Sequence, residues 1–217
     1  MFISNSPKKN IHPIPSIRRL PHYLRFLKAD QAHSRTNVSC TQIARALELD
    51  PTQVRKDLSI TGIVGRPRVG YNREQLAAAI EKFLGWQNAS DAFLVGAGGL
   101  GASLLGDSGP AHLPLNVVGV FDMQAELIGK RIGEHEVLPM DRLPDLAFRM
   151  HVSIGVLAVA PEKAQEATDV LVGSGIRAIW NLTPGRLEVP ENFIIEHLDF
   201  SSSLAVLSAR LQAMLKS

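Results

Sequence analysis

Apolar residues recur at helical spacing through the first third of the chain. Positions 17, 20, 23, 24 and 27 predict a helix over residues 17–29, after a loose arm rich in Pro, Ser and Asn over residues 1–15. After a polar loop over residues 30–38, Ser39 and Gln42 have the spacing of a capping box, which predicts a helix over residues 40–47. Asp50 before Pro51 then predicts the start of a further helix over residues 51–60.

The connection between the last two helices, residues 48–50, has the length found in helix-turn-helix motifs. The helix over residues 51–60 would bury Val54 and Leu58. It would expose side chains of the types that read DNA grooves, namely Thr52, Gln53, Arg55, Lys56 and Ser59. The glycine-rich segment 62–71 follows and presents Arg66 and Arg68 on a tight turn, like the wing of a winged helix. A helix over residues 73–84, ended by Gly85, would close this domain.

The pattern changes after residue 86. Short apolar segments predict strands over residues 92–95, 116–122, 153–160, 176–180 and 194–198, and helices are expected from residue 102, over 162–173 and over 202–215. Strands that are apolar throughout and alternate with helices are typical of a parallel sheet covered on both faces. We therefore expect an α/β protein with an N-terminal winged helix and a C-terminal Rossmann-like parallel sheet.

Charge divides the chain in the same way. Residues 1–85 hold fourteen Lys and Arg against six Asp and Glu, a net charge of +8, whereas residues 86–217 hold nine against fifteen, a net charge of −6. A basic domain is what a polyanion such as DNA requires of its partner. The alternative is a small helical domain with a basic hairpin and a solvated surface bias.

Composition is that of an ordinary globular protein, with 45% hydrophobic residues among 217. No apolar run approaches the length of a membrane span and no secretory signal is visible, so we expect a cytoplasmic protein with no membrane association. The single cysteine, Cys40, excludes an intrachain disulfide and a Cys-rich zinc site. Cys40 is expected to be a small buried residue, and no metal site is predicted.

A glycine fingerprint joins the first strand of the second domain to its helix. The run is Gly96-Ala97-Gly98-Gly99-Leu100-Gly101, and the next strand ends in Asp122, 21 residues beyond Gly101. A strand before this run, a helix after it and an acid at the end of the next strand are the context of a dinucleotide site.

Each position of the fingerprint has a physical role. Gly96 permits a tight turn, Gly98 lets the main chain approach a pyrophosphate, and Gly101 lets the helix pack against the strand. Asp122 can accept hydrogen bonds from ribose hydroxyls and would repel a 2′-phosphate, which favours NADH and NAD+ over their phosphorylated forms. Two alternatives remain: a glycine turn without a ligand, and another nucleotide-like ligand such as coenzyme A.

Catalytic groups are not evident near this predicted cofactor site. Both tyrosines, Tyr23 and Tyr71, lie in the basic domain, and the histidines are scattered without a pairing. A nucleotide site without a proton donor, joined to a DNA-binding domain, favours a sensor that is not an enzyme. The alternative is a small NAD-dependent oxidoreductase with an accessory basic domain.

Specific motifs extend along most of the chain. They are VRKDLS at residues 54–59, Gly62, Gly65, Gly70 and Tyr71, the fingerprint with Phe121-Asp122, Val159-Ala160-Pro161 with Ala164-Gln165, Gly175-Ile176, Trp180-Asn181 with Pro184, Val189-Pro190, and Asp199-Phe200. On these residues the chain resembles the Rex family of redox-sensing transcriptional repressors. The chain departs from the family pattern at three places. Gly99 stands where the family usually has Asn, the wing has Arg66-Pro67-Arg68 where relatives often have basic-Arg-Gly, and Asp107 stands where relatives often carry a tyrosine.

The resemblance implies a homodimer that exchanges its last helix between subunits. It implies a DNA-binding domain over residues 1–85, an NAD(H)-binding domain over 86–200 and an exchanged helix over 201–217. NADH would release the operator and NAD+ would permit DNA binding. Val159, Ala160 and Pro161 would lie beside the cofactor, and Phe200 would face the partner's cofactor site. Arg25 and Asp199 would join the two kinds of domain across the dimer.

The resemblance also suggests how DNA is held. The helix over residues 51–60 would lie in a major groove, where Arg55 and Lys56 contact bases or phosphates. Arg66 or Arg68 would enter an adjacent minor groove, which is narrow and attractive to arginine where A·T pairs follow one another. We therefore expect an A·T-rich palindromic operator in double-stranded DNA.

Overall fold

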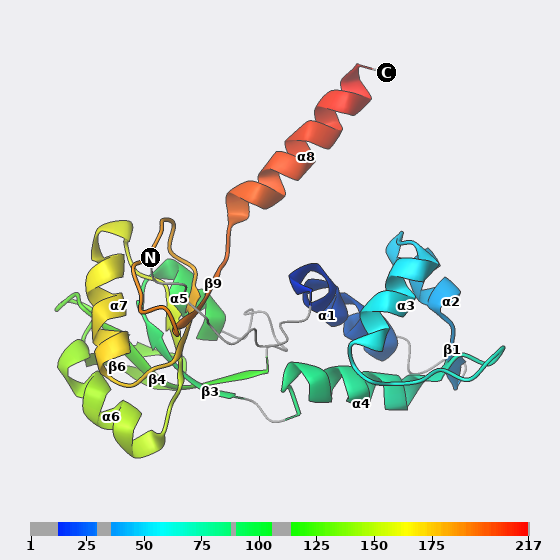
Figure 1. The fold of residues 1–217 in the computed structure, drawn as a ribbon. Coiled ribbons are helices and arrows are strands. Elements are labelled where there is room, and N and C mark those ends of the chain that lie inside the picture. The colour runs from blue at the N-terminus through cyan, green and yellow to red at the C-terminus, as the bar shows by residue number, and fades with distance from the viewer. Residues whose placement is uncertain (1–12, 30–35, 88–89, 106–113, 217) are drawn as a thin grey trace, which may run out of the picture. The chain divides into compact units, whose positions relative to one another are not determined.

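Two compact units make up the chain, Met1–Asn88 and Ala89–Ser217 (Figure 1). The computed structural model describes residues 13–29, 36–87, 90–105 and 114–216. The first unit is helical with one short antiparallel ladder, and the second is built on a mostly parallel sheet. The predicted α/β fold class, a winged helix followed by a Rossmann-like sheet, is confirmed.

Four helices surround the core of the first unit in its described part: α1 (Ile14–Ala29), α2 (Cys40–Leu47), α3 (Pro51–Ser59) and α4 (Arg73–Leu84). Both predicted start signals are present. Ser39 and Gln42 form the reciprocal capping box of α2. The Asp50 carboxylate accepts hydrogen bonds from the N–H groups of Gln53 and Thr52 at the start of α3, which lowers the pKa of Asp50.

Two details of this unit differ from the sequence-based expectation. α1 begins at Ile14, within the predicted loose arm, because Pro15 fits a first helical turn whose N–H groups need no partner there. The predicted polar loop contains β1 (Asn37–Val38), which pairs antiparallel with β2 (Tyr71–Asn72). A two-residue strand is too short to show a periodic pattern, and β1 is a strand only because it pairs with β2.

The wing, residues 61–72, is a hairpin between α3 and α4 (Figure 1). Arg66 and Gly70 exchange both main-chain hydrogen bonds, at 2.7 and 2.9 Å. Gly70 has a φ of +89°, and a Cβ there would lie 2.3 Å from the Val38 carbonyl oxygen. At Gly65 a Cβ would lie 2.9 Å from the Tyr71 ring. The base of the wing is therefore packed too tightly for a side chain at either glycine.

A buried carboxylate ties α1 to α3. Asp57 of α3 is fully buried, and its two oxygens accept hydrogen bonds from Arg19 at 2.6 and 2.9 Å and from the Tyr23 hydroxyl at 2.5 Å. Gln53, one turn earlier on α3, donates to the same carboxylate at 2.8 Å. Burial alone would raise the pKa of Asp57, but the hydrogen bonds from Arg19, Tyr23, Ser16 and Gln53 outweigh it and lower that pKa to about 2.

The pKa values of the two main partners of Asp57, Arg19 and Tyr23, are raised instead. The hydrogen bond to Asp57 raises the pKa of the Arg19 guanidinium, while burial and the bond to Asp57 raise the pKa of the Tyr23 phenol. Asp57 is therefore charged, and both partners hold their protons, at neutral pH. Removing the carboxylate charge would leave a cation without its counter-charge at a partly buried position.

Seven strands form the sheet of the second unit, in the order β5-β6-β4-β3-β7-β8-β9 among the described residues. All neighbours are parallel except β5 and β6. Their bounds are β3 (Ser90–Val95), β4 (Leu115–Asp122), β5 (Arg131–Ile132), β6 (His135–Pro139), β7 (Ile154–Leu157), β8 (Ala178–Asn181) and β9 (Ile194–His197). Without β5, this is the doubly wound order that reverses between its first and fourth strands, here β3 and β7.

Helices cover both faces of the sheet. The covering helices are α5 (Gly99–Leu105), α6 (Leu143–Met150) and α7 (Ala164–Gly173), with 3₁₀ turns at Met140–Arg142 and Pro161–Lys163. The last helix, α8 (Phe200–Leu215), buries none of its residues. Alternate residues of β3 enter the two cores: Phe93 and Val95 pack with α6 and α7, and Ala92 and Leu94 pack on the side of α5. Such two-sided burial requires strands that are apolar throughout.

β5, β6 and α6 were not predicted from the sequence. β6 is short, and the exposed Glu136 interrupts its apolar pattern. α6 begins with Pro144 in its first turn and exposes Phe148, so its buried face is limited to Leu143 and Ala147. β6 has no clear strand pattern. In α6, by contrast, the apolar residues 143, 146, 147 and 150 have helical spacing, so the sequence did contain a signal for this helix.

The Asp57 network generates a prediction about stability. Asp57→Asn is expected to lower the free energy of unfolding of the first unit by about 3 kcal/mol at pH 7, because Arg19 loses its counter-charge. Trp86 packs against this unit's core and Trp180 against the other, so Trp86 fluorescence during urea unfolding in a Trp180→Phe background reports it.

The pH dependence of stability shows whether Asp57 stabilises the first unit through its charge or only through packing. The stabilisation from Asp57 is present above its unfolded pKa of 3.8 and is lost as pH falls through the folded value of about 2. The stability gap between wild type and Asp57→Asn should therefore be constant above pH 5 and narrow below pH 4, with exposed Glu74→Gln as the charge-matched control. A gap that does not depend on pH would contradict the assignment.

Candidate functional site

The glycine fingerprint forms the turn between β3 and α5. Gly96 has a φ of +108°, and a Cβ there would lie 2.3 Å from the carbonyl oxygen of Ala158. A Cβ at Gly101 would lie 1.8 Å from the carbonyl oxygen of Gly96. Both positions therefore exclude a side chain, because main chain packs directly on main chain where β3, α5 and the end of β7 meet.

The middle of the fingerprint is open instead. Gly98, Gly99 and Leu100 are exposed, and among the described residues a Cβ at Gly98 or Gly99 would meet no atom within 4 Å. Gly98 thus has no internal packing reason to be a glycine. Bare main chain beside free space, at the carboxyl ends of the strands where the sheet order reverses, fits the approach of a pyrophosphate.

Asp122, at the end of β4, anchors this turn. Its side chain is 4% exposed, and its Oδ2 accepts a hydrogen bond from the Ala97 N–H at 2.6 Å while Oδ1 accepts one from the Gln124 N–H at 2.8 Å. A carboxylate has about four lone-pair directions. Asp122 can therefore hold the loop and still accept from a ribose hydroxyl. The loop-holding role was not predicted, because the spacing of the motif indicates only the ligand.

Val159, Ala160 and Pro161 follow β7 and lie next to the glycine turn, since Gly96 packs against Ala158. Sequence reasoning missed the residues that fix this segment. The Thr183 hydroxyl donates to the Val159 carbonyl at 3.0 Å. The buried Asn181 accepts from the Thr183 N–H at 3.0 Å and donates to the Thr183 carbonyl at 2.9 Å and to His197 Nδ1 at 3.0 Å. The ends of β7, β8 and β9 are thereby tied together.

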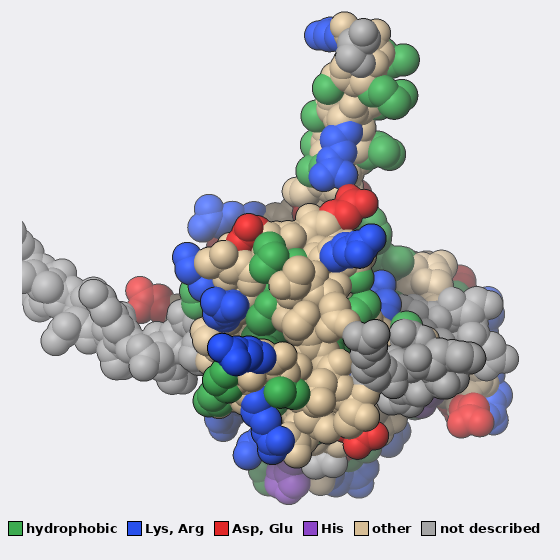
Figure 2. Space-filling view, turned by 90° about the vertical axis from the view of Figure 1, so that its right-hand side faces the viewer, with side chains coloured by type: hydrophobic (Ala, Val, Ile, Leu, Met, Phe, Trp, Pro, Cys, Tyr) green, Lys and Arg blue, Asp and Glu red, His purple; other side chains and the backbone are tan. Residues whose placement is uncertain are grey.

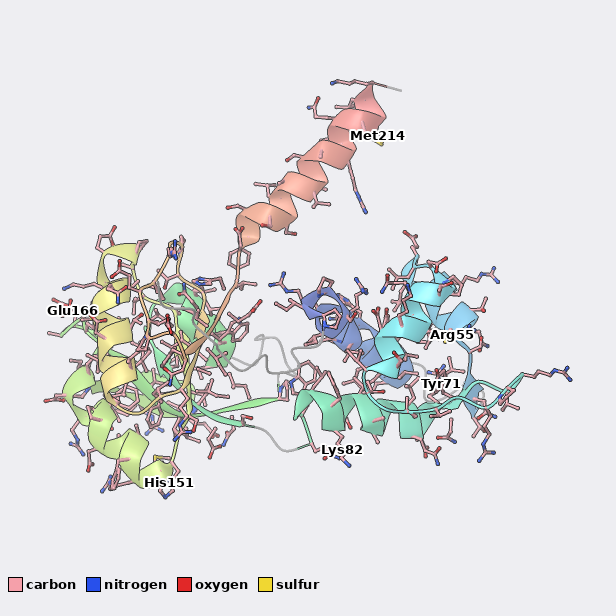
Figure 3. All side chains as sticks on the ribbon, viewed as in Figure 1. Arg55, Tyr71, Lys82, His151, Glu166 and Met214 are labelled. Atoms are coloured by element: carbon pink, nitrogen blue, oxygen red, sulfur yellow. The ribbon has the colours of Figure 1, made fainter. Side chains whose placement is uncertain are left out.

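The outer face of α3 carries the side chains predicted to contact DNA. Thr52, Arg55, Lys56 and Ser59 are exposed, and Arg55 is labelled on this helix in Figure 3. Gln53 is only partly exposed, and its amide donates to the buried Asp57. The Ser59 hydroxyl donates to the Lys56 carbonyl at 2.6 Å. Gln53 is thus held in place by the carboxylate that joins α1 to α3.

Arg66 and Arg68 are exposed on the wing, and Tyr71 lies at its base (Figure 3). Lys and Arg side chains are spread over the face that Figure 2 shows, with few acidic ones among them. Arg25, on α1, is also exposed. In the first unit, exposed basic side chains therefore stand on α1, on α3 and on the wing.

α8 carries a stripe of exposed apolar side chains. Phe200, Leu204, Leu207 and Leu211 recur at alternating spacings of four and three and are between 47 and 64% exposed. Hydrophobic side chains along this helix are visible in Figure 2. Asp199 caps the helix, since its carboxylate accepts from the Ser202 hydroxyl at 2.6 Å and the Ser201 N–H at 2.8 Å, which lowers the pKa of Asp199.

Other predicted features have simpler outcomes. Cys40 is partly buried rather than fully buried, at the first position of α2. Asp107 lies outside the described residues. In the described part of the chain, no three metal-ligating side chains gather and no helix is long and apolar enough to span a membrane.

Comparison with known proteins gives consistent matches. Residues 13–59 match the family model described as putative DNA-binding protein N-terminus, and residues 87–185 match the CoA binding domain. A redox-sensing transcriptional repressor Rex from Treponema denticola is 43% identical over 94% of this chain and 97% of its own, and one from Bacteroides fragilis is 41% identical over 92% and 90%.

Solved structures agree with these relatives. The repressor RSP, of the Rex family, is 32% identical with a TM-score of 0.83 over 95% of this chain and 96% of its own. RSP has also been solved with β-NAD+ and operator DNA, and with β-NADH, both with a TM-score of 0.83 and coverage of at least 96% of each chain.

The fingerprint generates a paired prediction. Gly98→Ala should leave the melting temperature of the second unit unchanged while weakening NADH binding about tenfold or more, because its methyl group would enter only the open space that we expect the pyrophosphate to occupy. Gly101→Ala should destabilise the unit by about 2 kcal/mol or more, because its methyl group meets the Gly96 carbonyl. Thermal unfolding and NADH titration calorimetry measure both effects. A Gly98→Ala variant that binds NADH like the wild type would remove Gly98 from the site.

Proposed function

The chain belongs to the Rex family of redox-sensing transcriptional repressors, and from this premise we propose that it binds operator DNA and releases it when NADH binds. The observation that carries the proposal is the pairing, in one chain, of a basic winged helix with an open glycine turn anchored by Asp122. The complexes of the related repressor with NAD+ and operator DNA and with NADH support it.

The cofactor site would consist of the fingerprint, Asp122 and the segment after β7. Main chain at Gly98, Gly99 and Leu100 would hold the pyrophosphate, and Gly96, Ala97 and Gly101 would shape the turn. Asp122 would accept from the ribose, and Val159, Ala160 and Pro161 would line the far side. When the cofactor is bound, the oxidation state of its nicotinamide ring distinguishes NADH from NAD+. Coenzyme A, the ligand named by the matching family model, is the competing ligand, and Asp122 disfavours the 3′-phosphate on its ribose.

DNA would be held by α3 in a major groove and by the wing in a minor groove. Thr52, Arg55, Lys56 and Ser59 are exposed for contact, and Gln53 would act beside them from its place on Asp57. Either Arg66 or Arg68 would reach a narrow, A·T-rich minor groove. A palindromic operator follows if two copies of α3 act together. Such a repressor would act in the cytoplasm, where its operator lies.

The dimer would form by exchange of α8. Its stripe is uncovered, and the sheet offers a complementary face: Ile194 of β9 pairs in register with Ala178 of β8, is 66% exposed, and shares a sheet face with Trp180. A second copy of α8 would bury both surfaces. Arg25 and Asp199 would then link the DNA-binding unit of one copy to the partner, and Phe200 would face the partner's cofactor, so that NADH favours one dimer arrangement.

The first experiment is a gel shift with the operator duplex of the solved relative. Wild type should bind it with NAD+ and release it with NADH, and Arg55→Ala should weaken binding about tenfold, with Lys130→Ala of the second unit as control. By linkage, the duplex should weaken NADH binding by the same factor in calorimetry. Equal NADH affinities with and without DNA would contradict the sensor. Oxidation of NADH by carbonyl substrates would favour the oxidoreductase alternative.

The dimer is tested on α8 itself. Leu207→Asp should dissociate the dimer in sedimentation velocity, because the stripe becomes charged at its centre. Ala209→Asp makes the same change on the opposite side of the helix and should leave the dimer intact. If both variants sediment like the wild type, the stripe is not the interface.

A further inference from the structure

The tip of the wing is a four-residue turn with an unusual residue in its third position. The Val69 N–H donates to the Arg66 carbonyl at 3.2 Å, which places Pro67 and Arg68 in the centre of the turn. Arg68 has a φ of +61°. Proline second and a positive φ third are the pattern of a type II turn, whose third position is normally glycine or asparagine. Arg68 therefore occupies a left-handed conformation that disfavours its side chain.

The surrounding hairpin keeps this turn from relaxing. Arg66 and Gly70 exchange both main-chain hydrogen bonds directly below it, and Gly70 packs on the Val38 carbonyl. Pro67 fixes its own φ near −65°. The main chain is held on both sides of Arg68, so its strained conformation is imposed by the hairpin.

Nothing in the described part of the chain offsets that strain. Arg68 is exposed, and its guanidinium has no hydrogen bond or ion pair with a described residue. Glycine would remove the strain, so the arginine brings no benefit to the folded unit. A strained backbone conformation that no interaction within the protein compensates is typical of a functional site.

We propose that Arg68, rather than Arg66, is the side chain that reads the minor groove, and that the strained turn is retained to present it. This rests on the proposed function. Arg66 emerges from the hydrogen-bonded rung of the hairpin, whereas Arg68 stands at the tip, beyond that rung. The rigid turn fixes the origin of the Arg68 side chain before DNA arrives, which reduces the entropy lost on binding.

Matched substitutions separate the two arginines. Arg68→Asn and Arg66→Asn remove the same charge, but only the first relieves strain, because asparagine tolerates a positive φ. The DNA probe is a duplex selected by wild type from a random pool, together with versions in which the A·T pairs outside the major-groove contacts are replaced by G·C or by inosine·C. Inosine·C lacks the amino group that distinguishes G·C in the minor groove.

Wild type should bind the G·C version about tenfold more weakly and the inosine·C version like the original. Arg68→Asn should bind the original about tenfold more weakly and lose the preference against G·C, while its melting temperature rises by about 3 °C. Arg66→Asn should keep the preference and show no rise in melting temperature.

Three results would overturn the inference: Arg68→Asn keeps the A·T preference, Arg66→Asn loses it, or Arg68→Asn melts below wild type. Failure of wild type to select any duplex is a different outcome. It would overturn the proposed function, and this inference with it, and so the two failures can be told apart.

Discussion

Main chain packed against main chain is the constraint on which the second unit depends. At Gly96 and Gly101, neighbouring carbonyl oxygens occupy the space of a side chain, so β3, α5 and the end of β7 approach more closely than any other residue would permit. That approach sets the turn, and Asp122 locks it through the Ala97 N–H. With Gly96 and Gly101 packed in this way, Gly98 is left exposed between them. The packing at Gly96 and Gly101 thus shapes the open turn at Gly98, which is the candidate cofactor site.

The first unit depends in the same way on a charge. Asp57 lies on α3, within an apolar face formed by Val54 and Leu58, and its burial is possible because Arg19 and Tyr23 of α1 supply its hydrogen bonds. The carboxylate ties α1 to α3 and holds Gln53 on the outer side of α3, among the side chains proposed to contact DNA. A hydrophobic residue would pack as well, but it would not orient polar side chains on two helices at once.

A structural feature could be predicted from the sequence where it depends on residues that are close together along the chain. Capping at Ser39 and Asp50, the glycine turn and the apolar strands are local patterns, and they determined the fold class and the candidate cofactor turn. Relations between distant segments were not visible. β1 exists only against β2, Asp57 looks like one more polar residue of a basic helix, and Asn181 with Thr183 ties strands that no spacing connects. The conformation of Arg68 likewise depends on the hairpin as a whole.

The double hydrogen bonding of Asp122 has a consequence for anyone who wishes to redesign cofactor preference. Exchanging this acid for a neutral or basic residue is the usual route to accommodating a phosphorylated ribose. In this chain the same exchange would release the tethers to the Ala97 and Gln124 amides. A change meant for specificity would thus loosen the glycine turn, and a successful redesign needs another hydrogen-bond acceptor for the Ala97 and Gln124 amides.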